Sequence, residues 1–577
     1  MTTYEADART LEPLPWPFTG RADELDLVRR CLTGARHGIV VTGPSGHGKT
    51  RLVTEAVRGT DCARVTGTPG MRGLDFAAFA HLLPGAVSLH RAVRLLSGVR
   101  LLVVDDAHLL DDASAALVHQ LAVHGRTRLV VIAADDGAPV PAAVSRLWTG
   151  ELLPRLALEP LPREETERLL TAGVGRVPEP LTAGRLHRLC GGDLRLLRAL
   201  VDALREGGPP YPAAADEWAW RGPVPVTAAV RERVAPALEG RGPGERESLE
   251  RLAFAEPLPL HLDDLDLDTV ERLEAAGLVR ADDEGAVRLA HPLHGAVLRA
   301  GGGRLRARRQ ARAPRDCGPA LAAEQRALAR RIERADVRAL PTPVGEWLAG
   351  EGAPVPAGYA AVRARFARLR GEVREAAAWA REGLRATPDD PACRAELAAV
   401  VPRLPQPAAT DDPYARYDAV RLGAPERVVG RLPDEVFARH ADALARGDGP
   451  ALDRAAEGLR QRGFLLFAAE AYAQAARTHR DPGAARTSRT RALALARRCQ
   501  GARTPALSGL VLGELTARQR QIVALAAAGL SNRQIAQRLT LSVRTVGNHL
   551  YSAYTRLGAS DRQQLPWLVE PPAGRSA

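Results

Sequence analysis

Lysine is almost absent from this 577-residue chain. Among its 80 basic residues, only Lys49 is a lysine, and all the others are arginine. A GC-rich genome disfavours lysine codons and would produce such a bias. One lysine kept against this bias indicates a position that needs a compact ammonium on a flexible stem and that the larger, planar guanidinium does not suit.

Several other features are scarce, and each narrows the class of protein. The six cysteines are scattered with no C-x-x-C pair, which argues against a zinc site or a disulfide framework and suits a reducing cytosol. Aromatic residues make up 4%, so extensive stacking of bases on aromatic platforms is disfavoured. No apolar run approaches the ~18–20 residues of a membrane span, and residues 1–17 lack a signal-peptide layout. We therefore expect a cytoplasmic protein with no membrane partner.

The length of the chain allows several domains, and its net positive charge allows an acidic partner. At 577 residues, roughly three to five domains are expected. The hydrophobic fraction of 45% is ample for packed cores, and the net charge of +12 permits nucleic-acid binding without requiring it.

The single lysine stands in a G-x-x-x-x-G-K-[ST] motif. The motif consists of Gly43, Pro44, Ser45, Gly46, His47, Gly48, Lys49 and Thr50. An apolar run before it predicts a strand, and residues 51–57 predict a helix, which is the context of a phosphate-binding P-loop. Backbone N–H groups would cradle a polyphosphate, Lys49 would reach its β- and γ-phosphates, and the Thr50 hydroxyl would hold Mg²⁺. The alternative is an ordinary glycine-rich turn. We expect ATP or ADP with Mg²⁺, and a Lys49 ammonium that faces solvent when no ligand is bound.

A second strand with acids at its end supports the nucleotide interpretation. Residues 99–104 are largely apolar and are followed by Asp105 and Asp106. Ligands of open parallel sheets bind at this carboxyl edge. Asp105 would act on Mg²⁺ and Asp106 would orient the attacking water as the catalytic residue; the alternative is an acidic helix cap. A third strand at 128–134 follows, and the β-α-β alternation predicts an α/β domain over residues 1–160.

The middle of the chain is predicted to be mainly helical. Residues 161–210 predict a helical lid, and residues 220–300 have a winged-helix outline, for which we favour a packing role over DNA binding. Arginines between 304 and 315 form either a nucleic-acid arm or a solvated linker. Residues 319–500 have helical periodicity with short breaks, typical of stacked hairpins that resemble tetratricopeptide units. Such a region binds partners or serves as a spacer.

Residues 511–570 change character and predict a helix-turn-helix. Residues 515–569 hold seven arginines and one acid. Thr516, Ser531 and Ser542 would cap three helices, and a short fourth helix would run from 561 to 568. The predicted apolar stripe of the third helix consists of Val543, Val546, Leu550, Tyr554 and Leu557.

With that face turned inward, the outer face of the third helix would read double-stranded operator DNA. Asn548 can bind an adenine edge, and Arg544 can reach guanine or phosphate. The candidate DNA-binding residues are Arg518, Ser531, Asn532, Arg533, Arg538, Ser542, Arg544, Thr545, Asn548, His549 and Tyr551. The alternative is an ordinary helical packing module.

These motifs carry a family resemblance. Leu515-Thr516-x-Arg518, Gly529-Leu530-Ser531-Asn532-x-x-Ile535-Ala536, Ser542-x-x-Thr545-Val546-x-x-His549 and Leu557-Gly558 closely resemble the LuxR-type helix-turn-helix. With the P-loop and the helical middle, the chain resembles a large ATP-binding regulator of the LuxR family. The resemblance implies a multidomain fold: an α/β P-loop NTPase with a helical lid and winged helix, an α-helical TPR-like solenoid, and an all-α helix-turn-helix.

The resemblance also implies sites and partners. Arg51 would join the P-loop at the nucleotide, Gly20 and Arg21 would lie near the base, and His291 near the phosphates. The expected partners are operator DNA, RNA polymerase and an inducer or protein that binds the helical region. The chain would form a homo-oligomer on activation. ATP turnover would be slow and serve as a switch. The sequence departs from the family pattern at several positions. Gly547 stands where the family has lysine, and Gln519 and Gln521 stand where it has glutamate. Asp135-Asp136 replace a basic residue that the resemblance leads us to expect as a sensor of the γ-phosphate.

The expected function is an ATP-binding, DNA-binding transcriptional regulator, such as an activator of a gene cluster. The alternatives are an ATP-hydrolysing DNA-remodelling motor and a signalling scaffold tethered to DNA by its C-terminal module. A motor needs rapid hydrolysis, usually with an arginine from a neighbouring subunit, and the sequence does not identify that arginine.

Overall fold

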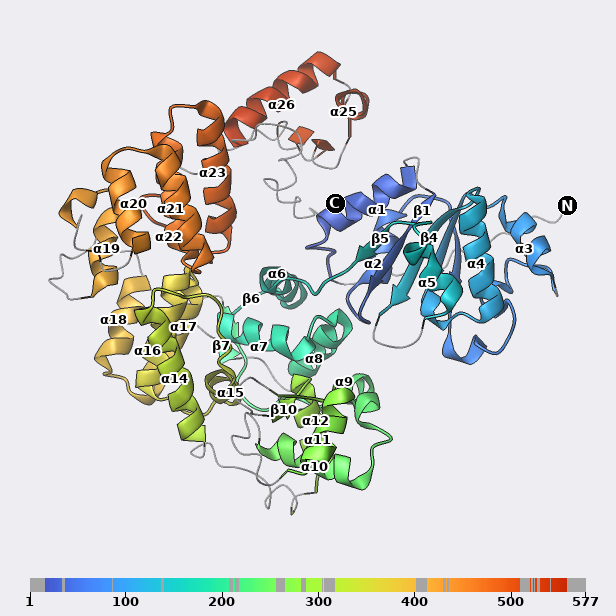
Figure 1. Ribbon diagram of the computed structural model, residues 1–577, viewed down its shortest axis with the longest axis horizontal. Coiled ribbons are helices and arrows are strands. Elements are labelled where there is room, and N and C mark those ends of the chain that lie inside the picture. The colour runs from blue at the N-terminus through green and yellow to red at the C-terminus, as the bar shows by residue number, and fades with distance from the viewer. Residues whose placement is uncertain are drawn as a thin grey trace.

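The structure, a computed structural model, describes most of the chain (Figure 1). The described residues are 16–33, 37–85, 87–135, 140–206, 211–212, 217–255, 265–281, 287–303, 305, 317–400, 412–428, 432, 435–508, 519, 522–523, 525–526, 530–539 and 541–557. Arg518, Thr516, the predicted helix at 561–568 and most of the basic stretch at 304–315 lie outside them. Within the described residues, no helix is long and apolar enough to cross a membrane.

The N-terminal domain is built on a five-stranded parallel sheet in the order β2-β3-β4-β1-β5. Its strands are β1 (Gly38–Gly43), β2 (Ala63–Thr66), β3 (Leu101–Asp105), β4 (Arg128–Ala134) and β5 (Arg155–Ala157). Its helices are α1 (Ala22–Thr33), α2 (Lys49–Ala56), α3 (Leu89–Leu96), α4 (Asp112–His124) and α5 (Ala142–Thr149). The three predicted strands are confirmed, and two short edge strands complete the sheet. Apolar clusters pack on both faces of the sheet, so β1, β3 and β4 are almost wholly buried, as parallel strands usually are.

The predicted helical lid contains three helices and a small sheet. The helices are α6 (Arg163–Val174), α7 (Pro180–Cys190) and α8 (Leu194–Glu206). The strands β6 (Val177–Pro178), β7 (Tyr211–Pro212) and β8 (Glu217–Ala219) pair in the order β6-β8-β7. This sheet was not predicted, because strands of two or three residues are too short to show an alternating apolar pattern. Trp218 on β8 is buried and anchors the sheet on the lid.

The winged-helix outline is present in the described part of 217–303. It contains α9 (Ala228–Val234), α10 (Pro243–Ala255), α11 (Leu267–Ala275), the antiparallel strands β9 (Val279–Ala281) and β10 (Val287–Leu289), and α12 (Pro292–Gly301). Gly277 has a φ of 70°, a left-handed conformation that glycine adopts without strain, and it ends the turn after α11 as expected.

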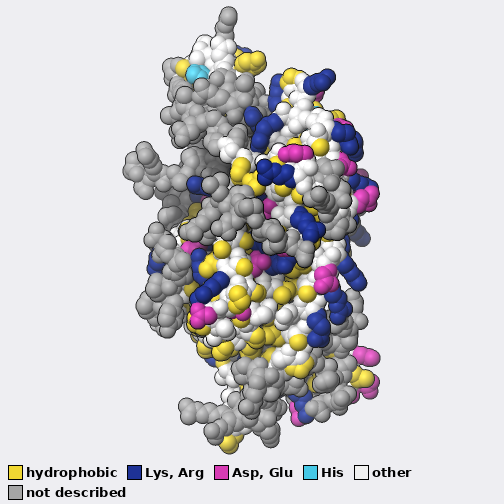
Figure 2. Space-filling model, turned by 90° about the vertical axis from the view of Figure 1, so that its left-hand side faces the viewer, with side chains coloured by type: hydrophobic (Ala, Val, Ile, Leu, Met, Phe, Trp, Pro, Cys, Tyr) yellow, Lys and Arg dark blue, Asp and Glu magenta, His cyan; other side chains and the backbone are white. Residues whose placement is uncertain are grey.

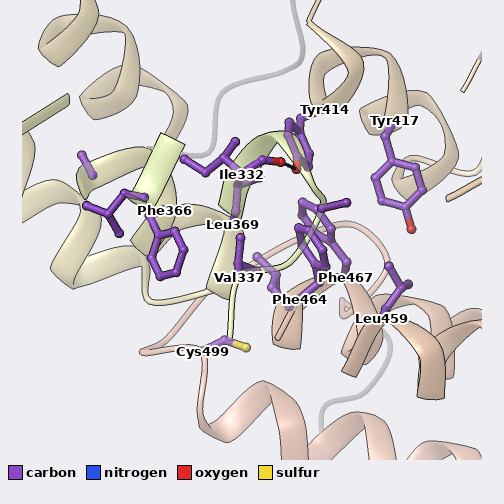
Figure 3. Packing of buried hydrophobic residues seen from close by; sticks show 14 of the residues in the cluster. Ile332, Val337, Phe366, Leu369, Tyr414, Tyr417, Leu459, Phe464, Phe467 and Cys499 are labelled. Carbon is purple, nitrogen blue, oxygen red and sulfur yellow. Dashed lines mark hydrogen bonds between the residues drawn. The ribbon is translucent and has the colours of Figure 1, made fainter. Parts of the chain in front are cut away.

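Helical hairpins fill the described part of 317–508, as the periodicity predicts. They are α14 (Gly318–Glu333), α15 (Pro343–Glu351), α16 (Ala357–Arg370), α17 (Val373–Ala386), α18 (Pro391–Val400), α19 (Pro413–Arg421), α20 (Glu435–Ala445), α21 (Gly449–Gln461), α22 (Leu465–Thr478) and α23 (Pro482–Arg497). One large core runs through them, and Figure 3 shows rings from different helices meeting in it. The outer side of these hairpins carries small hydrophobic patches among mixed charges (Figure 2).

The C-terminal unit has a small core of its own. Helices α25 (Asn532–Leu539) and α26 (Val543–Leu557) pack with Ile522 and Val523. The predicted stripe of α26 is wrong at its first position, because Val543 is 49% exposed. Val543 directly follows the cap at Ser542, so it precedes the point where α26 meets the core. Val546 and Leu550 are buried as predicted, and Ala553 is buried beside them. The side chains of Tyr554 and Leu557 lie outside the described set.

Candidate functional site

The P-loop connects β1 to α2 at the carboxyl edge of the sheet. Gly46 and Gly48 have φ angles of 78° and 85°, the left-handed region that lets a loop turn its backbone N–H groups inward. A Cβ on Gly46 would lie 2.0 Å from Asp193 Oδ1, so a larger residue there would displace the Asp193 carboxylate. The loop is thus both tightly curved and closely covered by another part of the chain.

Lys49 is buried rather than facing solvent, which corrects the sequence-based expectation. Its Nζ donates to the carbonyl oxygens of Gly43 (2.7 Å) and Pro44 (2.8 Å), and the residue is only 7% exposed. A buried ammonium needs acceptors, and here the loop's own carbonyls supply them. The lysine therefore also holds the loop in shape.

Three residues at the ends of α2 and β3 form a candidate magnesium site. The Thr50 hydroxyl donates to Asp105 Oδ1 at 3.2 Å, and the Asp106 backbone N–H donates to the same oxygen at 2.9 Å. Burial, and after it the Asp106 carboxylate, raise the pKa of Asp105 above its usual value. A cation here would favour the charged carboxylate, and one hydroxyl with one carboxylate, completed by phosphate oxygens, suits Mg²⁺. The residues present therefore fit the ion.

Asp106 adopts a strained backbone conformation at this edge. Its φ of 48° places it in the left-handed region, which non-glycine residues seldom occupy. Such strain is typical of functional sites, where surrounding structure holds the residue in position. Asp106 lies directly after the candidate magnesium ligand Asp105.

The lid rests directly on the P-loop. The Leu194 backbone N–H, at the start of α8, donates to the Gly46 carbonyl at 3.0 Å. A Cβ on Gly192 would lie 2.8 Å from His47 Nε2, and burial lowers the pKa of His47. Asp193 Oδ2 is 3.7 Å from the Arg233 guanidinium of α9. One turn, residues 191–194, thus links the P-loop to the winged-helix domain.

His291 lies on the other side of this turn. Its Nε2 would be 3.6 Å from a Cβ placed on Gly191, and its Nδ1 accepts from the Leu293 N–H to cap α12. Burial lowers the pKa of His291. The structure therefore brings His291 to the lid turn that covers the P-loop.

Gly20 and Arg21 contact the beginning of the lid. Arg21 is buried, ion-paired with Glu24 at 2.8 Å, and donates to the Glu159 carbonyl. Gly20 has a φ of 70°, and a Cβ on it would lie 2.8 Å from the Glu165 side chain. Arg51, the other basic candidate, is ion-paired with Glu55 on α2 at 2.9 Å.

Arg155 is a candidate that sequence analysis missed. Its Nε donates to Thr42 Oγ1 at 2.8 Å, and its Nη2 donates to Asp135 Oδ2 at 3.3 Å. Thr42 and Asp135 lie at the carboxyl ends of β1 and β4. The Arg155 guanidinium of the edge strand β5 thus reaches past β1 to the end of β4, where the sequence lacks the expected basic residue. Pairing of β5 with β1 would have placed Arg155 at this edge, but a strand of three residues is too short to be recognised in the sequence.

Arginines also join the lid to the helical hairpins. The Arg163 guanidinium of α6 is 2.7 Å from Glu375 Oε2 of α17, and Arg363 Nη2 of α16 donates to Glu375 Oε1 at 2.7 Å. Although burial alone would raise the pKa of Glu375, these two arginines lower it to about 2. This carboxylate therefore remains charged inside the protein.

A second arginine of the lid, Arg185, is buried at the same joint. Arg185 donates to the Gly350 carbonyl at 2.6 Å, pairs with Glu351 at 2.8 Å and stacks on Trp220 at 3.8 Å. Burial, the largest influence on it, lowers the pKa of Arg185 to about 10. Further pairs across the same joint are Arg188–Glu346, Arg221–Glu382 and Arg374–Glu217.

Helix α26 presents the predicted DNA-reading residues on its outer side. Asn548 and Tyr551 are exposed, whereas Thr545, Gly547 and His549 are half-buried. Arg533 and Arg538 are exposed on α25, and Asn532 is half-buried at its start. The side chain of Arg544 is outside the described set.

Two of the three predicted helix caps lie within the described residues, and both of these are present. Ser531 Oγ accepts from the Gln534 N–H at 3.3 Å, and Gln534 Oε1 accepts from the Ser531 N–H at 2.8 Å, which is a capping box. Ser542 Oγ accepts from the Thr545 N–H at 3.0 Å. These caps fix where α25 and α26 begin and so orient the exposed face of α26.

Comparison with known families identifies this C-terminal unit. Residues 513–568 match the family described as bacterial regulatory proteins, luxR family. An HTH-type transcriptional regulator of Mycobacterium bovis is 45% identical over 74 residues, which cover 13% of this chain and 8% of the relative. The HTH-type regulator YhjB of Escherichia coli is 47% identical over 58 residues, or 10% of this chain and 29% of that protein. The match thus spans a small part of each relative's length.

Solved structures resemble the rest of the chain only distantly. A signal transduction ATPase with numerous domains and a tetratricopeptide repeat sensor, from Pyrococcus horikoshii, aligns over 96% of this chain and 79% of its own, with 15% identity and a TM-score of 0.25. A Walker-type ATPase of Pyrococcus abyssi aligns over 49% of this chain and 96% of its own, with 13% identity and a TM-score of 0.31. TM-scores this low carry no inference about function. Residues 513–568 thus form a helix-turn-helix domain that matches the luxR family of bacterial regulatory proteins, and an α/β domain with a P-loop motif and a stack of helical hairpins precede it in the chain.

Proposed function

We propose that the chain is a DNA-binding transcription regulator whose DNA binding is controlled by ATP and ADP at the P-loop. The luxR-family domain supports the DNA-binding half of the proposal. The P-loop supports the nucleotide half, since Lys49, Thr50 and Asp105 lie at one edge of the sheet with the residue types that phosphate and Mg²⁺ require.

The observation that carries the switch is the contact between the lid and the loop. Gly46 accepts from Leu194 of the lid, while Lys49 is held by Gly43 and Pro44. Phosphate oxygens would compete for the Lys49 ammonium and so change the loop that the lid contacts. A nucleotide shifts the lid only as far as its affinities for the two arrangements differ.

The chemistry expected at the site is slow hydrolysis. Mg²⁺ held by Thr50 and Asp105 would supply charge neutralisation on the phosphates. Asp106 would orient and deprotonate the attacking water, and Arg155 would contact the terminal phosphate. Gly20 and Arg21 would lie near the base, where the strand-to-lid connection meets α6.

Movement of the lid would reach the rest of the chain through two joints. The Asp193–Arg233 pair connects it to the winged-helix domain beside His291, and the Arg163–Glu375 pair connects it to the helical hairpins. We infer that these movements control homo-oligomer formation and hence operator binding, because two recognition helices must be paired to fit two half-sites. We also propose that the regulator acts as an activator, contacts RNA polymerase and binds an effector on the helical hairpins.

Equilibrium binding of a fluorescent ATP analogue to the full chain tests the nucleotide half. Lys49→Ala should lower the affinity at least 100-fold, whereas Arg58→Ala, an exposed arginine near the end of α2, should leave it unchanged. Asp106→Asn should bind the analogue normally and hydrolyse ATP more slowly. Equal affinity of wild type and Lys49→Ala would refute the assignment.

A further inference from the structure

Helix α23, at the C-terminal end of the stack of helical hairpins (Figure 1), carries charge of one sign only. Residues 482–508 contain six arginines and no aspartate or glutamate, whereas residues 413–480 contain 11 arginines and nine acids. Arginines of the earlier helices have carboxylate partners, such as Glu435 for Arg439 on α20 and Glu457 for Arg460 on α21. The general abundance of arginine in the chain therefore does not explain why α23 lacks acids.

The packing of α23 turns its arginines to solvent. Ala492 and Leu495 are buried in the core of the hairpins, whereas Arg486, Arg489 and Arg498 are exposed. In the described part of the chain, none of these three arginines forms an ion pair. At 1.5 Å per residue, they extend over about 18 Å of the helix. The exposed side of α23 is thus a row of positive charges without internal partners.

Both ends of this helix are anchored on the hairpins. Near its start, Ser488 Oγ donates to Asp453 Oδ1 of α21 at 2.6 Å. Beyond its end, the guanidinium of Arg477 on α22 donates to the Ala506 carbonyl. The arginine row is therefore presented on a fixed helix rather than on a loose segment.

The side chains beside the arginines indicate what kind of partner fits. Thr487 and Ala494 are exposed there, and α23, which the structure describes in full, exposes no large apolar side chain. Protein–protein interfaces usually have an apolar core, whereas contacts to DNA phosphates come from arginines and small hydroxyl side chains. The composition of this face therefore favours the phosphate backbone of DNA over an acidic protein.

The length of the chain keeps α23 close to the DNA-binding domain. Ten residues separate Ser508, at the end of the hairpins, from Gln519, the first described residue of the C-terminal unit. Even in a fully extended chain, these two residues are at most about 40 Å apart. One turn of DNA measures about 34–36 Å. When α26 lies on its site, the end of the hairpins is thus within about one turn of the same duplex.

We propose that the exposed arginines of α23 bind the phosphate backbone of DNA beside the site that α26 reads. This second contact does not depend on sequence, and it rests on the proposed DNA binding by the luxR-family domain. With about 3.4 Å between successive phosphates along the duplex, a row of about 18 Å spans about five base pairs.

Two duplexes test this contact on the full chain, in whichever nucleotide state binds DNA more tightly. The short duplex holds a library-selected site alone, about 20 base pairs for two half-sites. The long duplex adds about 15 base pairs of arbitrary sequence on each side, or about 50 Å. Compared with wild type, Arg486→Gln/Arg489→Gln/Arg498→Gln should bind the long duplex at least 10-fold more weakly and the short duplex within twofold. Its salt slope on the long duplex should fall by about 2–3, because each phosphate contact contributes about 0.9.

Two further variants separate charge from structure. Lysine at the same three positions keeps the charge and should restore binding of the long duplex to within threefold of wild type. Arg91→Gln/Arg94→Gln/Arg100→Gln removes the same charge from exposed arginines in and beside α3, and it should leave both affinities unchanged.

Three results would overturn the second contact: no loss on the long duplex, equal losses on the two duplexes, or an equal loss in the α3 variant. Failure of lysine to restore binding would also overturn it, because phosphate attraction requires only the charge. A wild-type chain that bound neither duplex would instead refute the proposed DNA binding.

Discussion

Arg163 and Glu375 form an ion pair at 2.7 Å between the lid of the P-loop domain and the helical hairpins. Glu375 is buried, and it also accepts from Arg363 of the hairpins. A buried carboxylate keeps its charge only when partners replace water. The lid and the hairpins therefore share one charged centre, so a rotation of either has to carry the other along or separate these charges.

Arg163→Gln should loosen this joint. Breaking one side of a buried pair typically costs about 3–5 kcal/mol, here reduced by the remaining Arg363 contact. Hydrogen exchange of the peptides in α6 and α17 should become faster than in wild type. Arg168→Gln, on the same helix but exposed and paired with Glu165, is the control and should not change exchange. Equal exchange in the two variants would contradict a structural role for the joint.

Acid should destabilise the hairpins through His440. Its ring lies between the Tyr417 hydroxyl and Gln474 Oε1, and burial lowers its pKa to about 4. Because the folded pKa lies below the unfolded value of 6.5, this contribution to stability is complete above pH 6.5 and is lost as the pH falls toward 4. The shift corresponds to at most about 3 kcal/mol.

Hydrogen exchange of α19–α22, corrected for the intrinsic rate, measures this effect. Protection should fall between pH 6.5 and pH 4 in the wild-type chain. His440→Phe removes the titrating group and should flatten the dependence, whereas His124→Gln, an exposed histidine of α4, should leave it intact. A variant at position 440 that kept the wild-type slope would show that another group is responsible.

Arg155→Ala should impair the response to the terminal phosphate. The guanidinium lies at the carboxyl ends of β1 and β4 through Thr42 and Asp135. We expect at least a 10-fold loss in ATP turnover while ADP affinity changes less than threefold. Arg146→Ala, an exposed arginine of α5, is the matched control. Loss of ADP and ATP binding to the same extent would indicate a purely structural role for Arg155.

Variants should distinguish the residues that contact DNA phosphates from those that read bases. Arg533→Ala on α25 should weaken binding to all sequences and lower the salt slope by about one, because it neutralises a phosphate. Asn548→Ala on α26 should cost about 1–3 kcal/mol only on a site that the full chain selects from a random library. Arg94→Ala, exposed on α3, controls for loss of net charge. Identical losses on selected and random DNA for both variants would contradict this division.

The parts that could be predicted from the sequence were those with strong local rules. The P-loop needs glycines at fixed positions, and the caps of α25 and α26 are set by serines followed three residues later by Gln534 and Thr545. These motifs carry their geometry within a few residues. The helical hairpins were equally readable from periodicity and breaks.

What could not be predicted depends on contacts between distant segments. Nothing local distinguishes Arg163 or Arg155 from the other arginines, since their partners come from α17 and from β4. The burial of Lys49 depends on loop carbonyls that lie close only after the P-loop has closed. Val543 fits the apolar period of α26 but precedes its contact with the core.

Nucleotide at the P-loop should control binding of DNA by the luxR-family domain. The measurement is the affinity of the full chain for a library-selected site with ATP, with ADP and without nucleotide. ATP and ADP should give affinities at least 10-fold apart, about 1.4 kcal/mol, and Lys49→Ala should abolish this difference while Arg58→Ala preserves it. Equal affinity of the wild-type chain in all three conditions would refute nucleotide control of DNA binding.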